Sequence, residues 1–321
     1  MKIAIVKLSA MGDIIHTMVV LEFIKKAYPN IIIDWIVEES FSPILAHNPH
    51  IDNILPINLK SIKKDKKLIF REIKRVREYA KNSYDLVIDA QGLIKSAIVS
   101  RLLSQKIVGF DKESIRESLA SIFYTKKVTI GYEKNVIDRN ITLISNALDI
   151  DDIDVLNKSP FLFYTSIQKA DIVFIVGAST LNKIYPKENF LEVAKGLKGR
   201  EISVVWANED EKEVAEFLED KLDYVKSLSL SLDGLKSLIS NASLIIGGDT
   251  GPTHIAWGVN TPSITLFGNT PHHRNTYITD VNRVIHSNSK VNPLKLDKSD
   301  FSIKDIDPKE IIKVAKELLD D

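Results

Sequence analysis

The segment at residues 243–254, SLIIGGDTGPTH, joins a short apolar run to two glycines and then to the start of a helix. The apolar residues 244–246 are typical of a buried strand. Pro252 suits a first helical turn, where its missing N–H is not needed, and Asp249 and Thr250 can cap free N–H groups. Such a corner presents N–H groups and a positive helix dipole, which can hold a phosphate group. An ordinary capped helix has the same pattern, so this segment alone leaves both interpretations open.

Apolar runs alternate with segments of helical spacing on both sides of this corner. Strands are predicted at residues 2–8, 31–37, 86–90, 107–110, 171–177, 202–206, 244–248 and 263–267. Helices are predicted at residues 13–27, 68–79, 93–103, 187–198, 211–220, 235–241 and 308–319. Strands that alternate with helices indicate parallel sheets covered by helices on both faces.

The length of the chain allows two domains, because 321 residues can build two cores of ordinary size. Residues 155–170, which include Pro160, fit a linker between the halves. We therefore expect an α/β fold with two doubly wound domains that face each other across a cleft. The expected domains are residues 1–160 and 161–321, with the last helix, near 308–319, packing back on the first domain. Ligands bind at the carboxyl ends of the strands in such sheets.

The composition excludes several classes of protein. Lys+Arg and Asp+Glu both number 43, so the chain has no electrostatic preference for nucleic acid, and we expect no nucleic-acid partner. There is no cysteine, which excludes disulfides and thiolate chemistry and is compatible with the cytoplasm. No apolar run approaches the ~20 residues that span a bilayer. The apolar start of the chain is followed by Lys7 and lacks a cleavage site, so it is typical of a first strand and not of a signal peptide.

Motifs for metal, dinucleotide and hydrolase chemistry are missing from the sequence. There is no HExxH and no acidic metal cage, so we expect no tightly bound metal and no other cofactor. There is also no GxGxxG, no GxxxxGK[ST] and no GxSxG, which counts against dinucleotide-binding, P-loop and α/β-hydrolase enzymes.

Asp13 lies near the start of the first predicted helix, after the loop that ends the first strand. One interpretation is an aspartate that caps the helix, a role worth about 1 kcal/mol. The other is a carboxylate at the ligand-binding edge that takes a proton from a substrate hydroxyl group. The local residues favour the capping interpretation and leave the base open.

Two loops of the second half carry groups suited to a nucleotide. Ser179 and Thr180 offer donors after the first strand of that half, and Lys183 is a mobile point charge suited to phosphate. Glu211 follows the next strand, where an acid can accept hydrogen bonds from ribose hydroxyl groups. A solvated loop lysine and an acid in a first helical turn are the ordinary alternatives.

Residues 60–77 concentrate positive charge in a chain without net charge. The segment holds nine basic residues (Lys60, Lys63, Lys64, Lys66, Lys67, Arg71, Lys74, Arg75 and Arg77) against Asp65 and Glu72. A solvated helix face is the ordinary interpretation of such a run. The alternatives are an anionic acceptor or an anionic membrane surface, at about 1 kcal/mol per basic residue near the lipid.

Five segments in matching order and spacing carry a resemblance that covers nearly the full chain. They are IVKLSAMGDIIHT (5–17), DWIVEESF (34–41), VIDAQGLIKSA (87–97), IRESLASIFY (115–124) and GGDTGPTHIAWG (247–258). These segments resemble the lipopolysaccharide heptosyltransferases, and most of all their type I members. The AMGD and GDTGPTH elements are specific in combination.

The resemblance implies a GT-B fold with two Rossmann-like domains, the acceptor in the first and the nucleotide-sugar in the second. It also implies inverting transfer of L-glycero-D-manno-heptose from ADP-heptose to Kdo of the lipid A inner core. We accordingly expect a monomer in the cytoplasm that contacts the inner membrane peripherally.

The resemblance also assigns roles to residues. Asp13 matches the catalytic base. The positions that match the donor site are Ser179, Thr180, Lys183, Glu211, Leu230, Asp249, Thr250, Gly251 and His254. The positions that match the acceptor site are Lys60, Lys63, Lys64, Lys95, Arg116 and Arg139.

The chain departs from the family pattern mainly on the acceptor side. Some family arginines are lysines here, one is Ser61, and a family histidine is Asn135. Lysine cannot reproduce the bidentate grip of a guanidinium group, so the acceptor is expected to bind more loosely or to be decorated differently. The alternatives are heptosyltransferase II, another GT-B sugar transferase, a non-catalytic nucleotide-binding protein, or a membrane-binding protein that uses residues 60–77.

Overall fold

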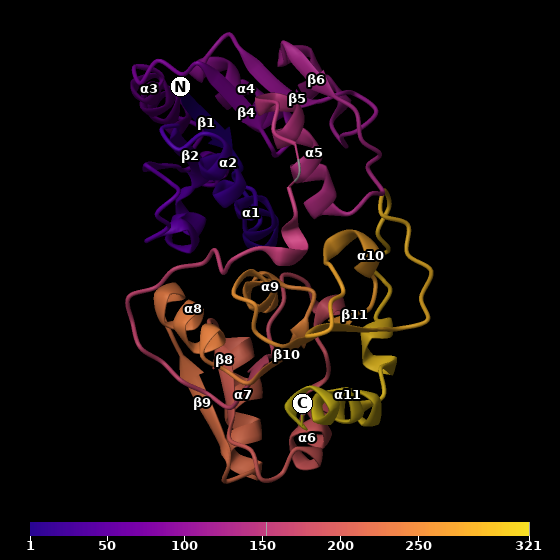
Figure 1. The fold of residues 1–321 in the computed structure, drawn as a ribbon. Helices are drawn as coiled ribbons and strands as arrows, with labels where there is room; N and C mark the ends of the chain where they lie inside the picture. Colours follow the sequence, from indigo (N-terminus) through magenta and orange to yellow (C-terminus); the bar gives the residue numbers. More distant parts are fainter. Residues whose placement is uncertain (152, 321) are drawn as a thin grey trace. The chain divides into compact units, whose positions relative to one another are not determined.

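The computed structural model describes residues 1–151 and 153–320, without the side chains of Lys63 and Asp320. The chain divides into two compact units, Met1–Phe161 and Leu162–Asp321, each with its own sheet (Figure 1). Within the described ranges, no helix is long and apolar enough to cross a membrane.

The first unit is built on a six-stranded sheet in which every neighbouring pair is parallel. Its strands are β1 (Lys2–Val6), β2 (Ile32–Glu38), β3 (Asn53–Ile57), β4 (Leu86–Asp89), β5 (Ile107–Phe110) and β6 (Lys126–Val128), in the order β3-β2-β1-β4-β5-β6. Its helices are α1 (Met11–Met18), α2 (Leu21–Ala27), α3 (Leu68–Ala80), α4 (Ile94–Leu103) and α5 (Val136–Leu148), together with short 3₁₀ helices.

The order of the strands places the helices of this unit in two layers. Chain connections run one way along the sheet from β1 to β3 and the other way from β4 to β6, and right-handed crossovers then put helices on opposite faces. In agreement, α4 contacts both α3 and the 3₁₀ helix Ser118–Phe123, whereas α1 contacts α5. The helix predicted at residues 13–27 is two helices, divided at the β-branched pair Val19 and Val20, whose side chains lower helix propensity.

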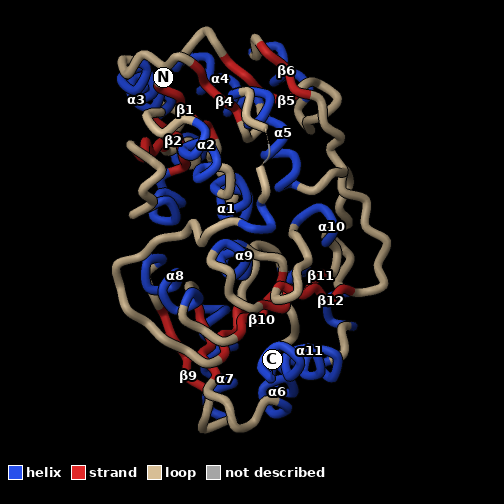
Figure 2. The backbone as a smooth tube through the Cα atoms, in the orientation of Figure 1, coloured by secondary structure: helices blue, strands red, loops and turns tan. Residues whose placement is uncertain are grey.

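The second unit has a six-stranded parallel sheet with the equivalent strand order and connections. Its strands are β7 (Ile172–Ile175), β8 (Ile202–Trp206), β9 (Val225–Ser229), β10 (Leu244–Gly248), β11 (Ser263–Phe267) and β12 (Asn282–His286), in the order β12-β11-β10-β7-β8-β9. Its helices are α6 (Lys187–Gly196), α7 (Glu209–Lys221), α8 (Leu232–Ser240), α9 (Gly251–Gly258), α10 (His272–Asn275) and α11 (Pro308–Asp320). Figure 2 shows how helices flank both sheets.

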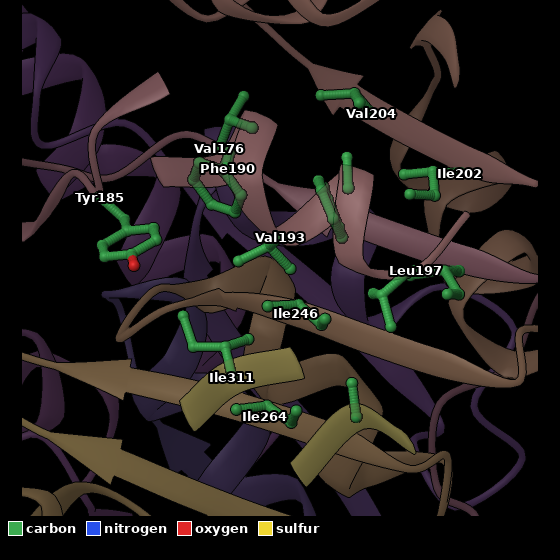
Figure 3. Packing of buried hydrophobic residues seen from close by; sticks show 14 of the residues in the cluster. Val176, Tyr185, Phe190, Val193, Leu197, Ile202, Val204, Ile246, Ile264 and Ile311 are labelled. Atoms are coloured by element: carbon green, nitrogen blue, oxygen red, sulfur yellow. The ribbon is translucent and has the colours of Figure 1, made fainter. Parts of the chain in front are cut away.

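The core of the second unit lies between its sheet and α6, α7 and α11. The ring of Phe190 lies 5.3 Å, centroid to centroid, from those of both Phe174 and Tyr185. Figure 3 shows Tyr185 and Phe190 in this core, with Ile311 of α11 beside the strands. The fully buried Ile311 and Ala315 make α11 part of the second unit's core, because its apolar stripe matches the face of this sheet. That the last helix also packs back on the first domain stays a prediction.

Each sheet has a switch point where successive connections leave in opposite directions. In the first unit it lies between β1 and β4, and in the second between β7 and β10. Loops at the carboxyl ends of these strands diverge there and leave room for a ligand. Asp13, Lys183 and Asp249 follow β1, β7 and β10, so these three predicted residues lie at the switch points.

Candidate active site

Asp13 lies in the first turn of α1, at the switch point of the first sheet, and its side chain is half-buried. Its Oδ2 atom accepts a hydrogen bond from the N–H of Ala10 at 3.2 Å, so Asp13 does cap the helix. The other carboxylate oxygen, Oδ1, accepts no hydrogen bond from the residues that the structure describes. Capping therefore orients the carboxylate and leaves one oxygen able to receive a proton.

The loop before Asp13 is tied to the loop that follows β4. The side-chain oxygen of Gln91 accepts hydrogen bonds from the N–H groups of Leu8, at 2.9 Å, and Ser9, at 3.0 Å. The buried ammonium group of Lys7 donates to the carbonyl of Ala90 at 2.8 Å. These hydrogen bonds join the loops after β1 and β4, so they fix the start of α1 and with it the position of Asp13.

Asp89, the last residue of β4, holds the same loop through hydrogen bonds. Its carboxylate is buried and accepts hydrogen bonds from the N–H of Gly92 and the hydroxyl groups of Ser96 and Tyr124. Burial raises the pKa of the Asp89 carboxyl, although these donors oppose the shift. Neither Asp89 nor Gln91 was predicted as a site residue, because the Tyr124 partner of Asp89 and the Leu8 and Ser9 partners of Gln91 lie far away along the chain.

In the second unit, the most organised polar cluster is centred on Asp249, directly after β10. Its Oδ2 atom lies 2.9 Å from the Lys183 Nζ and 3.0 Å from the Nδ2 of Asn275. Its Oδ1 atom lies 3.0 Å from the Nε2 of His254. Burial alone would raise the pKa of this carboxyl, but the His254 hydrogen bond and the charge of Lys183 outweigh burial and hold the pKa well below its usual range.

Two glycines allow this cluster to be compact. A Cβ atom on Gly248 would lie 2.9 Å from the carbonyl oxygen of Lys183, so only glycine lets that loop cross the end of β10. A Cβ on Gly177 would collide with the carboxylate of Glu211, which therefore lies over the end of β7. Glu211 also accepts a hydrogen bond from the N–H of Ala207 at 2.8 Å. The absence of side chains at Gly248 and Gly177 thus allows Lys183 and the Glu211 carboxylate to lie at the same switch point.

The first turn of α9 presents free N–H groups beside Asp249. We expected Thr250 to cap this helix with its side chain, but the structure shows that Thr250 is the N-cap residue without such a bond. The Asp249 oxygens are likewise engaged by the side chains described above. Among the described residues, the N–H groups of Thr250 and Gly251 have no acceptor, because neither is reached by a side chain or by the helix itself. An anion is the natural partner for such groups.

The other predicted donor-site residues lie at the same sheet edge. Ser179 and Thr180 follow β7 with exposed side chains, and the 3₁₀ helix Leu181–Lys183 comes directly after them. Leu230 follows β9 and is half-buried. Asn275, at the end of α10, was not predicted, because nothing in its local sequence indicates the contact with Asp249.

Four predicted acceptor-side residues of the first unit are exposed: Lys60, Lys64, Lys95 and Arg116. The Nζ of Lys60 donates to the hydroxyl of Ser40 at 3.0 Å and lies 4.2 Å from the centre of the Phe41 ring. The side chain of Lys63 lies outside the described residues.

Arg139 differs from the other acceptor-side residues, because its side chain is buried. Its guanidinium group donates to the carbonyl oxygens of Ile130 at 2.9 Å, Gly131 at 2.8 Å and Ser114 at 2.6 Å. It also lies 4.6 Å from the centre of the Phe110 ring. These carbonyl groups and the ring give Arg139 a structural role, and acceptor binding by Arg139 stays a prediction.

Replacing Arg139 with alanine should lower the free energy of unfolding by about 3 kcal/mol or more, since it leaves buried carbonyl groups without donors. The exposed Arg101 of the same unit is the matched control, and Arg101→Ala should change stability by less than about 0.5 kcal/mol. Urea unfolding of both variants measures the difference. A stable Arg139→Ala protein that binds the acceptor poorly would contradict the structural role and favour the prediction that Arg139 binds the acceptor.

Asp249→Asn should change how stability depends on pH. Because the pKa of this carboxyl is lowered in the folded state, its contribution is complete above the pKa of an unfolded aspartate and is lost as the pH falls below that value. The difference in unfolding free energy between wild type and variant should shrink below about pH 4, by at most about 1.4 kcal/mol per pH unit. Urea unfolding at about pH 6 and about pH 3 tests this, and a constant difference would contradict the ion pairing.

Metal chemistry has no evident ligand set here. Within the ranges that the structure describes, no group of three His, Cys, Asp or Glu side chains is arranged to hold a metal ion. The second site has the Lys183 ammonium group and the positive end of α9 beside Asp249.

Comparison with known proteins identifies the family. The sequence pattern of glycosyltransferase family 9 (heptosyltransferase) matches residues 70–301. Lipopolysaccharide heptosyltransferase 1 of Campylobacter coli is 41% identical, with 100% of both chains covered, and its namesake in Pseudomonas aeruginosa is 31% identical over 84% of this chain and 79% of the relative. The structure of E. coli heptosyltransferase WaaC with ADP-2-deoxy-2-fluoro heptose is 26% identical, with a TM-score of 0.82 and 99% of both chains covered. The two units are accordingly the Rossmann-like domains of a GT-B fold, and the chain is an enzyme that belongs to glycosyltransferase family 9, the heptosyltransferases.

Proposed function

We propose that this enzyme transfers L-glycero-D-manno-heptose, with inversion, from ADP-heptose to Kdo of the lipid A inner core. The observation that carries the proposal is the cluster of Asp249, Lys183 and His254 beside the free N–H groups of α9. That cluster suits a diphosphate, and a related enzyme has been solved with an ADP-heptose analogue. The relatives named above act on lipopolysaccharide, which supports the acceptor class.

The donor is proposed to lie along the carboxyl edge of the second sheet. Lys183 and the N–H groups of Thr250 and Gly251 bind the diphosphate. Glu211 accepts hydrogen bonds from the ribose, as acids after the second strand of nucleotide-binding sheets do. Ser179 and Thr180 supply hydroxyl groups, Leu230 packs against the adenine, and Asp249 and His254 border the diphosphate and the heptose.

The reaction is proposed to be a single displacement at the anomeric carbon. A hydroxyl oxygen of Kdo forms the new bond to that carbon while the bond to the ADP oxygen breaks, which inverts the configuration. Asp13 receives the hydroxyl proton on Oδ1, the oxygen that capping leaves available. Negative charge then gathers on the departing ADP, where Lys183 and the positive end of α9 stabilise it.

The acceptor carries its own negative charge, on the Kdo carboxylate and the lipid A phosphates. The exposed Lys60, Lys64, Lys95 and Arg116 are proposed to bind these groups, and Lys63 is proposed to join them. We further propose a monomer without a metal or other cofactor that works in the cytoplasm, at the surface of the inner membrane where its lipid substrate resides.

Mass spectrometry of reaction products tests the function directly. The purified chain is mixed with Kdo-lipid A and a panel of nucleotide-sugars, and we expect the mass of one heptosyl residue to be added from ADP-heptose alone. A heptose-terminated acceptor separates this activity from that of a type II enzyme, since only the Kdo-terminated acceptor should react. ADP binding without donor consumption in the presence of acceptor would contradict the proposal.

A further inference from the structure

One face of the first unit exposes large apolar side chains. Phe70 of α3 is 76% exposed, and Leu119 and Ile122 of the 3₁₀ helix Ser118–Phe123 are 64% and 70% exposed. Ile94 and Ile98 of α4 are exposed as well. Several large apolar side chains exposed on neighbouring elements are typical of an interaction site.

These side chains belong to one layer. Helix α4 contacts both α3 and the 3₁₀ helix, and the N–H of Ile94 donates to the Glu117 carboxylate, just before the 3₁₀ helix, at 2.7 Å. Ile94 and Ile98, four residues apart, share one face of α4. Leu119 and Ile122, three residues apart, are aligned in a 3₁₀ helix. The inward side chains of the layer, such as Ala97 and Ala120, join the core, so the exposed residues occupy its outer face.

Positive charge accompanies the apolar residues on α3. Phe70, Lys74 and Arg77 are spaced four and seven residues apart, so they form one exposed stripe. Lys66 and Lys67 are also exposed just before this helix. Within the described part of the chain, no ion pair engages these lysines or Arg77. Arg71 and Arg75 differ from these residues, because both pair with the buried Glu72 of the same helix and so stabilise the helix.

The layer also has a defined relation to the substrate edge. Helices α3 and α4 follow β3 and β4, so both begin at the carboxyl edge of the sheet. Lys66, Lys67, Phe70 and Ile94 lie at or near these helix starts. The apolar and basic groups therefore adjoin the edge that holds Asp13.

We propose that this outer face of α3, α4 and the 3₁₀ helix docks on an anionic lipid bilayer. Phe70, Leu119 and Ile122 enter the interface, and Lys66, Lys67, Lys74 and Arg77 bind the lipid phosphates. An aromatic and aliphatic surface bordered by unpaired cations is the arrangement of proteins that lie on a membrane. The inference rests on the proposed function, because a lipid-anchored acceptor must be reached at the bilayer surface.

Vesicle sedimentation tests the surface. Wild type should bind vesicles of phosphatidylglycerol and phosphatidylethanolamine, and should bind pure phosphatidylcholine vesicles at least tenfold more weakly. Leu119→Asp/Ile122→Asp and Lys66→Ala/Lys67→Ala/Lys74→Ala should each reduce binding to anionic vesicles at least tenfold. The matched controls are Leu156→Asp, at another exposed leucine of the same unit, and Lys309→Ala/Lys313→Ala/Lys316→Ala on α11. Both controls should bind as wild type does.

Transfer to a water-soluble Kdo acceptor without acyl chains separates this inference from the proposed function. The docking variants should keep wild-type rates with that acceptor and lose at least tenfold with acceptor embedded in anionic vesicles. Vesicle binding that the docking substitutions leave unchanged would overturn the inference and leave the transferase assignment intact. A wild-type protein that fails with the soluble acceptor would instead contradict the proposed function. Loss of self-association in the apolar variant, without vesicle binding by wild type, would assign the face to a second copy of the chain.

Discussion

Asp13→Ala should reduce heptosyl transfer by a factor of about 10² to 10⁴, the range that a positioned general base contributes. The variant should bind ADP as wild type does, because the donor cluster lies in the other unit. The expected loss is in kcat, since the carboxylate acts only when the acceptor oxygen attacks. Steady-state kinetics with both substrates, together with calorimetric titration of ADP, measures the two quantities.

Asp13→Asn separates the two roles of this residue. An asparagine oxygen can still accept the hydrogen bond from Ala10, so stability should be preserved, whereas alanine should lower it by about 1 kcal/mol. Asparagine cannot take the proton, so turnover should fall as far as it does with alanine. Near-normal turnover of Asp13→Asn would mean that Asp13 is only a cap and that the base lies elsewhere.

Lys183→Ala should weaken ADP binding by about 10- to 100-fold. This is the loss expected when one or two charge-assisted hydrogen bonds to phosphate are removed. The KM for the acceptor should stay within about twofold of the wild-type value, because the acceptor is proposed to bind to the first unit. Removing the lysine also leaves the buried Asp249 carboxylate without its cation, which adds to the repulsion of an incoming diphosphate.

Lys187→Ala is the matched control for this experiment. Lys187 begins α6, four residues after Lys183, and pairs with Glu213 at 3.3 Å on the surface. Its loss should leave ADP affinity unchanged. An equal loss of donor and acceptor affinity in Lys183→Ala would instead point to a role in the arrangement of the two domains.

The central strands were predictable from sequence, whereas the edge strands were not. β1, β4, β7 and β10 are covered on both faces and consist mainly of apolar residues. The four strands that were not predicted are β3, β6, β9 and β12, which form the edges of the two sheets. Edge strands are partly solvated and tolerate Pro56 and repeated lysines, so their hydrophobic pattern is weak. Helix α5 was also not predicted.

The candidate site was predictable where a residue acts through its position on a strand–turn–helix corner. Asp249, Lys183 and Glu211 follow buried strands, and the structure places all three at the switch point of the second sheet. Asn275 and Gln91 could not be found in this way, because each acts through a partner that only the fold brings near. For Arg139, the local sequence indicates a basic side chain suited to the acceptor. It does not reveal the backbone carbonyl groups that the fold brings to the guanidinium group.

The contact between Lys183 and Asp249 has a consequence for the catalytic cycle. Asp249 is an internal counter-ion for the Lys183 ammonium group, so this partly buried charge is never left without a partner. If Lys183 binds the diphosphate as proposed, the diphosphate must displace this carboxylate from the lysine. The carboxylate can then pair with the lysine again, so we expect Asp249 to favour the release of ADP after transfer.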